Sequence, residues 1–189
     1  MNKKQLIVTS ILLSLMLVLA ITQGFFKEKF EQVALIDNGI SQFKEYSFDE
    51  GNYVISLPNE WTVDEKESKG QYISHKLSFR DRNNKLTGSL EIINTKGEIN
   101  VFAENDLKNQ SLNYFNEEVM PFKNSNYSGV LVQYKTTVNN GYNFRNECYY
   151  LDLDDGKKAK LLFNLNEKDY KENIKTVFNT IVSSINKSK

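Results

Sequence analysis

The side chains that most often carry enzyme chemistry are scarce in this sequence. His75 is the only histidine and Cys148 is the only cysteine. A histidine metal cluster, a catalytic triad and a His–Cys dyad all need further partners, and an internal disulfide needs a second cysteine. We therefore expect His75 to be a structural residue at a sheet surface and Cys148 to be a buried, inert thiol.

One acidic turn has the composition of a cation site. Asp152, Asp154 and Asp155 precede Gly156, and clustered carboxylates on a tight turn suit calcium. The spacing does not match an EF-hand loop, because Gly156 stands where a third oxygen ligand is needed and no glutamate follows at the required distance. We interpret this segment as a solvated hairpin turn and predict no metal site.

Other carboxylates leave an enzymatic function as the rival interpretation. Asp64, Glu65 and Glu91 could act as acid and base in a hydrolase of envelope polymers. The first two are interleaved with lysines, which is typical of an exposed loop. The serines lie in no G-x-S-x-G or S-x-x-K context, and phosphate-binding glycine motifs are missing. The sequence thus predicts no catalytic residue and no cofactor.

Aromatic residues form the candidate contact surface. Tyrosine combines a large apolar area with a polar tip, which suits a protein interface. The alternative is that part of the cluster fills a sheet face, and that Trp61 is a core anchor. The candidate interface residues are Tyr142, Phe144, Tyr149, Tyr150 and Trp61.

Length and charge limit the classes of protein to which the chain can belong. It has 189 residues, which fit one domain with a short appendage. The 24 basic and 24 acidic residues balance and are spread along the chain, so no nucleic-acid partner is expected. Aromatic residues make up 12% of the chain, which argues against disorder.

The N-terminal residues 1–26 have the pattern of a signal-anchor or transmembrane segment. Lys3 and Lys4 precede an uncharged run that starts at Leu6 and ends with Phe26 as an interface aromatic. About 20 helical residues match a hydrocarbon core of roughly 30 Å. We favour an uncleaved anchor because good small residues for a peptidase are missing. Cleavage near Gly24 is the alternative.

We expect this segment to make a single pass through the cell membrane, with the N-terminus cytoplasmic and the body extracytoplasmic. The flanking lysines are nearly balanced, so the N-terminal position of the segment decides the orientation. Residues 27–45 should form a juxtamembrane helix, which stops at Asn38 and Gly39, and then a linker over 41–45. The apolar stripe of this helix is too short for a firm coiled-coil prediction.

Residues 46–189 show the alternation of an antiparallel sheet interrupted by helices. Helical spacing joins Ala103, Leu107 and Ser111 to Tyr114 and Phe115, and a C-terminal amphipathic helix follows an N-cap at Asn166. Asn139, Asn140 and Gly141 indicate a hairpin turn. Segregated helices and strands predict an α+β class. The expected strands lie at 46–48, 53–57, 71–80, 86–94, 129–138, 142–153 and 158–165.

The order of these segments resembles the PsbP-like fold over residues 46–186. The resemblance lies in the strand 53–58 followed by Trp61, the middle helix, the strand start at Gly129 and Val130, and the helix end at 181–185. That family includes the PsbP subunit of photosystem II, a Ran-binding nuclear import factor and many bacterial extracytoplasmic proteins. It implies a central antiparallel sheet flanked by helices, an α/β/α sandwich. It supplies no site residue for this chain.

The same resemblance implies a function. Known members act as binding or assembly factors rather than as catalysts. Together with the anchor, this predicts a membrane-anchored extracytoplasmic module that binds a protein partner. A cleaved, secreted small-molecule binder and the envelope-polymer hydrolase are the alternatives.

Overall fold

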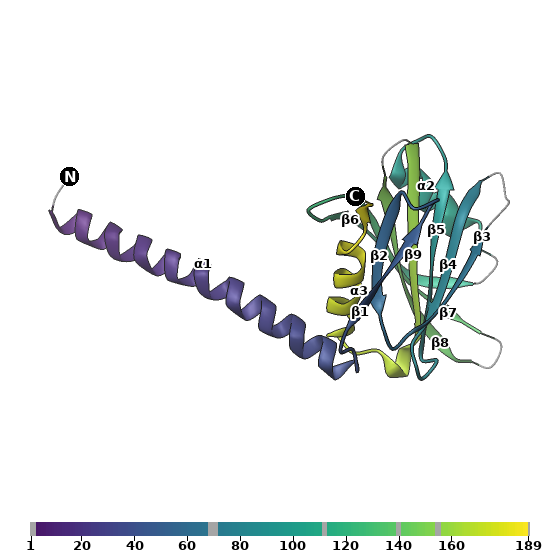
Figure 1. Ribbon diagram of the computed structural model, residues 1–189. Helices are drawn as coiled ribbons and strands as arrows, with labels where there is room; N and C mark the ends of the chain where they lie inside the picture. Colours follow the sequence, from purple (N-terminus) through teal and green to yellow (C-terminus); the bar gives the residue numbers. More distant parts are fainter. Residues whose placement is uncertain (1–2, 68–71, 111–112, 139–140, 154–155, 189) are drawn as a thin grey trace. The chain divides into compact units, whose positions relative to one another are not determined.

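The computed structural model describes residues 3–67, 72–110, 113–138, 141–153 and 156–188 (Figure 1). The chain divides into two units, Met1–Gly39 and Ile40–Lys189. The first unit holds the helix α1 (Lys3–Asp37), and the second holds a body of strands and helices.

Helix α1 contains the apolar segment. Its part Lys3–Thr22 has 20 residues and a mean hydropathy of 2.3, so it is long and apolar enough to span a membrane. The hydroxyls of Thr9, Ser14 and Thr22 each donate to a carbonyl oxygen one turn earlier, at 2.9 Å. These polar groups are thereby satisfied without water, as a lipid environment requires.

The end of α1 follows the predicted stop signal. The Asn38 side chain donates to the carbonyl oxygen of Ala34 at 2.8 Å, and the Gly39 N–H donates to Ile36 at 2.9 Å. Gly39 has a φ of 70°, which glycine adopts without steric cost. Because α1 is unbroken up to Asp37, the segments expected as transmembrane and juxtamembrane form one continuous helix.

The body contains two antiparallel sheets. The smaller sheet has the order β1-β2-β10, with bounds Phe43–Phe48, Tyr53–Pro58 and Asn186–Lys187. The larger has the order β3-β4-β5-β9-β8-β7-β6. Its strands are Thr62–Glu67 (β3), Ile73–Arg80 (β4), Leu86–Asn94 (β5), Tyr114–Lys123 (β6), Ser128–Thr137 (β7), Asn143–Asp152 (β8) and Lys157–Asn166 (β9).

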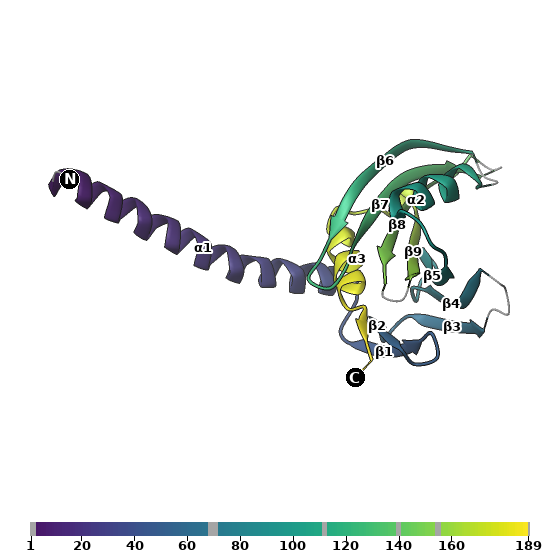
Figure 2. The same cartoon turned by 90° about the horizontal axis from the view of Figure 1, so that it is seen from above.

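The larger sheet lies between two helical layers. Helix α2 (Ile99–Lys108) packs on one face, against β7 and β8. Helix α3 (Ile174–Ser183) and the smaller sheet cover the other face (Figure 2). This confirms the expected α+β class with a central sheet flanked by helices.

Strand alternation divides the core into two parts. Towards α3, Phe163 of β9 stacks on Phe178 with ring centroids 4.1 Å apart, and both side chains are fully buried. Towards α2, Val132 and Tyr150 pack with Leu107. Successive residues of a strand face opposite sides, so β8 and β9 contribute to both parts. This double burial explains the nearly continuous run of buried positions in β8, whereas β9 alternates between buried and half-buried positions.

The secondary structure predicted for two segments is wrong. Asp64 and Glu65, expected in an exposed loop, lie in the edge strand β3 (Thr62–Glu67), which pairs with β4. Tyr114 and Phe115 belong to β6 rather than to the helix, because α2 ends at Lys108. Both strands lie at sheet edges, where only one side is paired and burial leaves little alternation in the sequence.

The starts of two elements also differ from the prediction. Strand β1 begins at Phe43, inside the expected linker. Asn166 caps the short 3₁₀ helix η2 (Glu167–Asp169) instead of α3, which begins at Ile174. Asn139 and Asn140 of the predicted hairpin turn, Ser111 of the predicted helix face, and Asp154 and Asp155 of the acidic turn lie outside the described residues.

Candidate functional site

Three of the five candidate interface residues are in the core. Tyr149 and Tyr150 are each 1% exposed and Trp61 is 8% exposed. Trp61 stacks on Phe79, with ring centroids 5.5 Å apart. A partner cannot contact these rings without unfolding the body, so they do not support the predicted surface. Adjacent tyrosines on β8 face opposite sides, and here both sides of the strand are covered.

The other two candidate residues reach the surface at one end of the larger sheet. Tyr142 is 53% exposed, and the ammonium group of Lys168 lies 5.8 Å from the centre of its ring. Phe144 is half-buried two residues further along, in register with Thr136 of β7. We call Tyr142, Phe144 and Lys168 the hairpin-end surface. It combines apolar area with one positive charge.

A polar network that the sequence analysis missed lies beneath α2. Asp106 Oδ2 accepts a hydrogen bond from the Tyr150 hydroxyl at 2.6 Å, and the Lys160 ammonium lies 2.7 Å from the same oxygen. This links α2 to β8 and β9. Cys148 lies nearby, fully buried, and burial raises the pKa of its thiol to about 12. The network therefore fixes a helix and offers no thiolate nucleophile.

Beneath α3, the carboxyl group of Glu147 is buried at 1% exposure. The Tyr149 hydroxyl lies 3.4 Å from Oε2 and donates to it, whereas Oε1 has no partner among the described residues. Burial raises the pKa of Glu147, and a hydrogen bond from Gln133 and the charge of Lys175 oppose this only in part. The strand position alone gave no sign that an acid would be enclosed here.

The three carboxylates considered for catalysis are divided between the two faces of the larger sheet. Asp64 and Glu65 are neighbours on β3 and so face opposite sides of the sheet. Glu91 of β5 makes an ion pair with Lys76 at 2.5 Å. His75 is 6% exposed, deeper than the expected sheet surface, and its Nε2 lies 3.6 Å from Glu65.

The described residues contain no group of three or more His, Cys, Asp or Glu side chains arranged to hold a metal ion.

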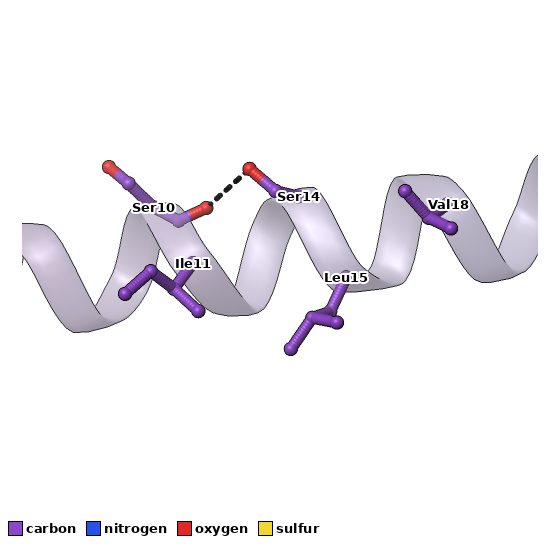
Figure 3. A pocket seen from close by; sticks show the side chains of 5 residues that line it. All are labelled: Ser10, Ile11, Ser14, Leu15 and Val18. Carbon is purple, nitrogen blue, oxygen red and sulfur yellow. Dashed lines mark hydrogen bonds between the residues drawn. The ribbon is translucent and has the colours of Figure 1, made fainter.

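Hollows among the described residues include a polar one and an apolar one. A polar hollow of about 400 Å³ opens where the smaller sheet meets β9. An apolar hollow of about 280 Å³ runs along α1. Figure 3 shows its lining on successive turns of one helix, so it is a groove between neighbouring side chains rather than an enclosed site. The lining of this groove consists of Ser10, Ile11, Ser14, Leu15 and Val18.

Comparison with solved structures finds a protein with the same arrangement of elements. The solution structure of cyanobacterial PsbP (CyanoP) from Synechocystis matches with a TM-score of 0.55 and 16% sequence identity. The match covers 78% of this chain and 94% of that chain.

A crystal structure of a protein from Bacteroides thetaiotaomicron also matches, with a TM-score of 0.52 and 10% identity. That match covers 79% of this chain and 50% of that chain, so this chain spans half the length of that protein. No family model and no curated protein matches the sequence. At these identities the likeness concerns the fold, and the protein carries a PsbP-like α+β fold behind an apolar N-terminal helix.

Proposed function

We propose that this protein is a membrane-anchored, non-catalytic binding or assembly module with its body on the extracytoplasmic side. The observation that carries the proposal is a PsbP-like fold on a chain that starts with a membrane-length apolar helix. The resemblance to the PsbP-like fold implies a module that binds rather than one that catalyses. The helix would hold that module at the membrane where its partner resides.

The placement of the carboxylates favours binding over hydrolysis. A glycosidase needs two carboxyl groups that flank one bond, roughly 5–10 Å apart. Asp64 and Glu65 face opposite sides of an edge strand, and Glu91 is held by Lys76. Neither the polar hollow nor the apolar groove is lined by any of these three acids.

The hairpin-end surface is where we place the protein contact. Tyr142 offers an exposed ring and Phe144 a partly exposed one, and aromatic residues are enriched in interfaces. Lys168 beside the ring adds a positive charge that suits an acidic rim on the partner. Phe144 lies on the paired strand β8, Tyr142 directly precedes that strand, and Lys168 belongs to η2.

Site-specific crosslinking in native membranes tests this proposal. A photoreactive phenylalanine analogue replaces Tyr142 in the full chain, and the same analogue replaces Tyr72 in a control. Tyr72 is a suitable control because it is an aromatic residue with 72% exposure away from the hairpin. We expect position 142 to give one discrete crosslinked protein that position 72 does not give. Equal products from both positions, or none from position 142, would rule out this surface.

A further inference from the structure

We propose that the partner presents an acidic segment to the hairpin-end surface, with Arg145 as the main contact for its carboxylates. This inference rests on the proposed function, because it names the chemistry of the partner at that same surface. It is carried by a guanidinium group that is held by a tyrosine ring and makes no ion pair among the described residues.

Arg145 follows Phe144 on β8 and is half-buried. Its guanidinium carbon lies 3.8 Å from the centre of the Tyr170 ring, which belongs to the segment between η2 and α3. This contact holds the group in place and leaves the N–H donors at its edge available. Within the described ranges none of these donors has a hydrogen-bond acceptor. They can therefore donate to the carboxylates of a partner.

Three acids at this end of the larger sheet are paired with lysines. The ion pairs are Glu167 with Lys135, Asp169 with Lys85 at 3.1 Å, and Glu172 with Lys175 at 3.1 Å. Arg145 and Lys168 have no such partner in the part of the chain that the structure describes, and each lies over a tyrosine ring instead. These two cations are therefore left for the acids of a partner.

Two acids act on Arg145 without pairing with it. Lys135 lowers the pKa of Glu167 mainly through its hydrogen bond, and the charge of Arg145 adds a smaller lowering. Burial raises the pKa of Glu147, which weakens the negative charge that this acid can offer to Arg145. Lys135 is also directly opposite Arg145 in the β7–β8 register, so two like charges lie side by side. The surroundings of Arg145 thus favour an acidic ligand.

Carboxylates on a polypeptide fit this arrangement of groups. The planar guanidinium can donate two parallel hydrogen bonds to the two oxygens of one carboxylate, and the Lys168 ammonium adds a point charge for a second. Tyr142 and Phe144 offer apolar area to the carbon atoms of the same segment. A segment with several acidic side chains can use both cations and the rings together, which an apolar or a basic segment cannot.

Fluorescence anisotropy with the full chain in non-ionic detergent tests the preference for acids. The probe is labelled octaglutamate, and labelled octaglutamine is the neutral comparison. We expect octaglutamate to bind at least about tenfold more tightly at low ionic strength, because only its side chains form charge-assisted hydrogen bonds. Added salt should weaken this binding, since it screens the charges.

Variants of three cations localise the binding. Arg145→Gln should weaken octaglutamate binding about tenfold, and Arg145→Lys should weaken it less, because it keeps the charge without the planar fork. Lys168→Gln should weaken it about threefold, as expected for an exposed ion pair. Lys44→Gln is the matched control, since Lys44 also lies over a tyrosine ring, that of Tyr46 at 5.1 Å, but on β1. It should leave binding unchanged.

Three binding results would overturn this inference. They are no binding at roughly 1 mM octaglutamate, equal affinity for octaglutamine, or equal weakening by Lys168→Gln and Lys44→Gln. Crosslinking from position 142 separates this inference from the proposed function. A discrete crosslinked protein that persists in both the Arg145→Gln and the Lys168→Gln chains would keep the contact surface and reject the acidic segment.

Discussion

At the residue scale, the protonation of Glu147 should affect the stability of the body. Its carboxyl group is buried, its pKa is raised by that burial, and Oε1 has no partner among the described residues. A carboxyl group with a raised pKa in the folded state stabilises that state fully below its ordinary value of 4.5. This contribution is lost as the pH rises through the raised pKa, because ionisation then occurs in a buried place.

We predict that Glu147→Gln stabilises the body at neutral pH. The amide keeps the shape and one acceptor oxygen of the protonated acid but cannot ionise. The gain should be about 1 kcal/mol at pH 7, the lower end of the cost of a buried unpaired polar atom, and it should vanish near pH 4. Thermal unfolding of the full chain across this pH range measures it.

Glu117→Gln is the control for charge alone, since Glu117 is exposed on β6. It should leave the pH dependence of unfolding unchanged. If the Glu147→Gln variant and the parent protein had the same unfolding temperature at every pH, the buried carboxyl group would not be the source of the pH dependence of stability.

At the scale of elements, the pairing of β7 with β8 leaves no space beside Gly129. A Cβ atom at this position would overlap the carbonyl oxygen of Tyr150 and would lie 3.0 Å from the Cα atom of Leu151. Both atoms belong to the backbone of β8, so neither can rotate away as a side chain could. The close approach of the two strands therefore requires glycine here.

We predict that Gly129→Ala lowers the free energy of unfolding by about 2 kcal/mol or more, as overpacking does in well-packed regions. Chemical denaturation of the full chain checks this value. Ser128→Ala, one residue earlier and exposed, should change it by less than about 0.5 kcal/mol. Equal denaturation midpoints for the two variants would show that β7 and β8 can move apart to fit the methyl group without a loss of stability.

The elements that the sequence predicted well are those with one or two buried faces. Strands β2, β7 and β9 have regular burial patterns, and α3 buries five apolar side chains along one stripe. Burial selects apolar residues at the period of the element, and this leaves a readable pattern. Edge strands lack that selection. Strand β6 is mostly exposed and has an irregular register between Phe115 and Glu118.

The candidate sites were harder to predict than the elements. Tyr142 could be selected from its residue type, but the burial of Tyr149 and Tyr150 depends on which helices cover the sheet. The contact of Asp106 with Lys160 and the enclosure of Glu147 depend on tertiary register between elements far apart in the chain. Sequence spacing carries no direct signal of such contacts.

At the scale of the whole molecule, the membrane attachment that we propose would depend on the apolar part of α1. We predict that Leu13→Arg moves the full chain from the membrane to the soluble fraction, because arginine in the middle of a span costs about 2.5–3.5 kcal/mol on insertion scales. Leu13 lies near the centre of the stretch Lys3–Thr22. Val33→Arg changes the same helix outside that stretch and should leave the chain in the membrane fraction.

The intact mass of the membrane-bound protein decides between an anchor and a cleaved signal. We expect a mass that includes residues 1–26. A mature chain that begins near Gly24 would instead support the secreted alternative.

The attachment point of the helix also has a mechanical consequence. The chain enters the body at β1, an edge strand of the smaller sheet. Just before it, the Ser41 N–H donates to the Glu60 carboxylate and the Gln42 carbonyl accepts from the Asn59 N–H. A pulling force on α1 would therefore act first on the β1–β2 pair and less directly on the seven strands of the larger sheet. Under a stretching force, we expect the smaller sheet to unfold before the larger sheet does.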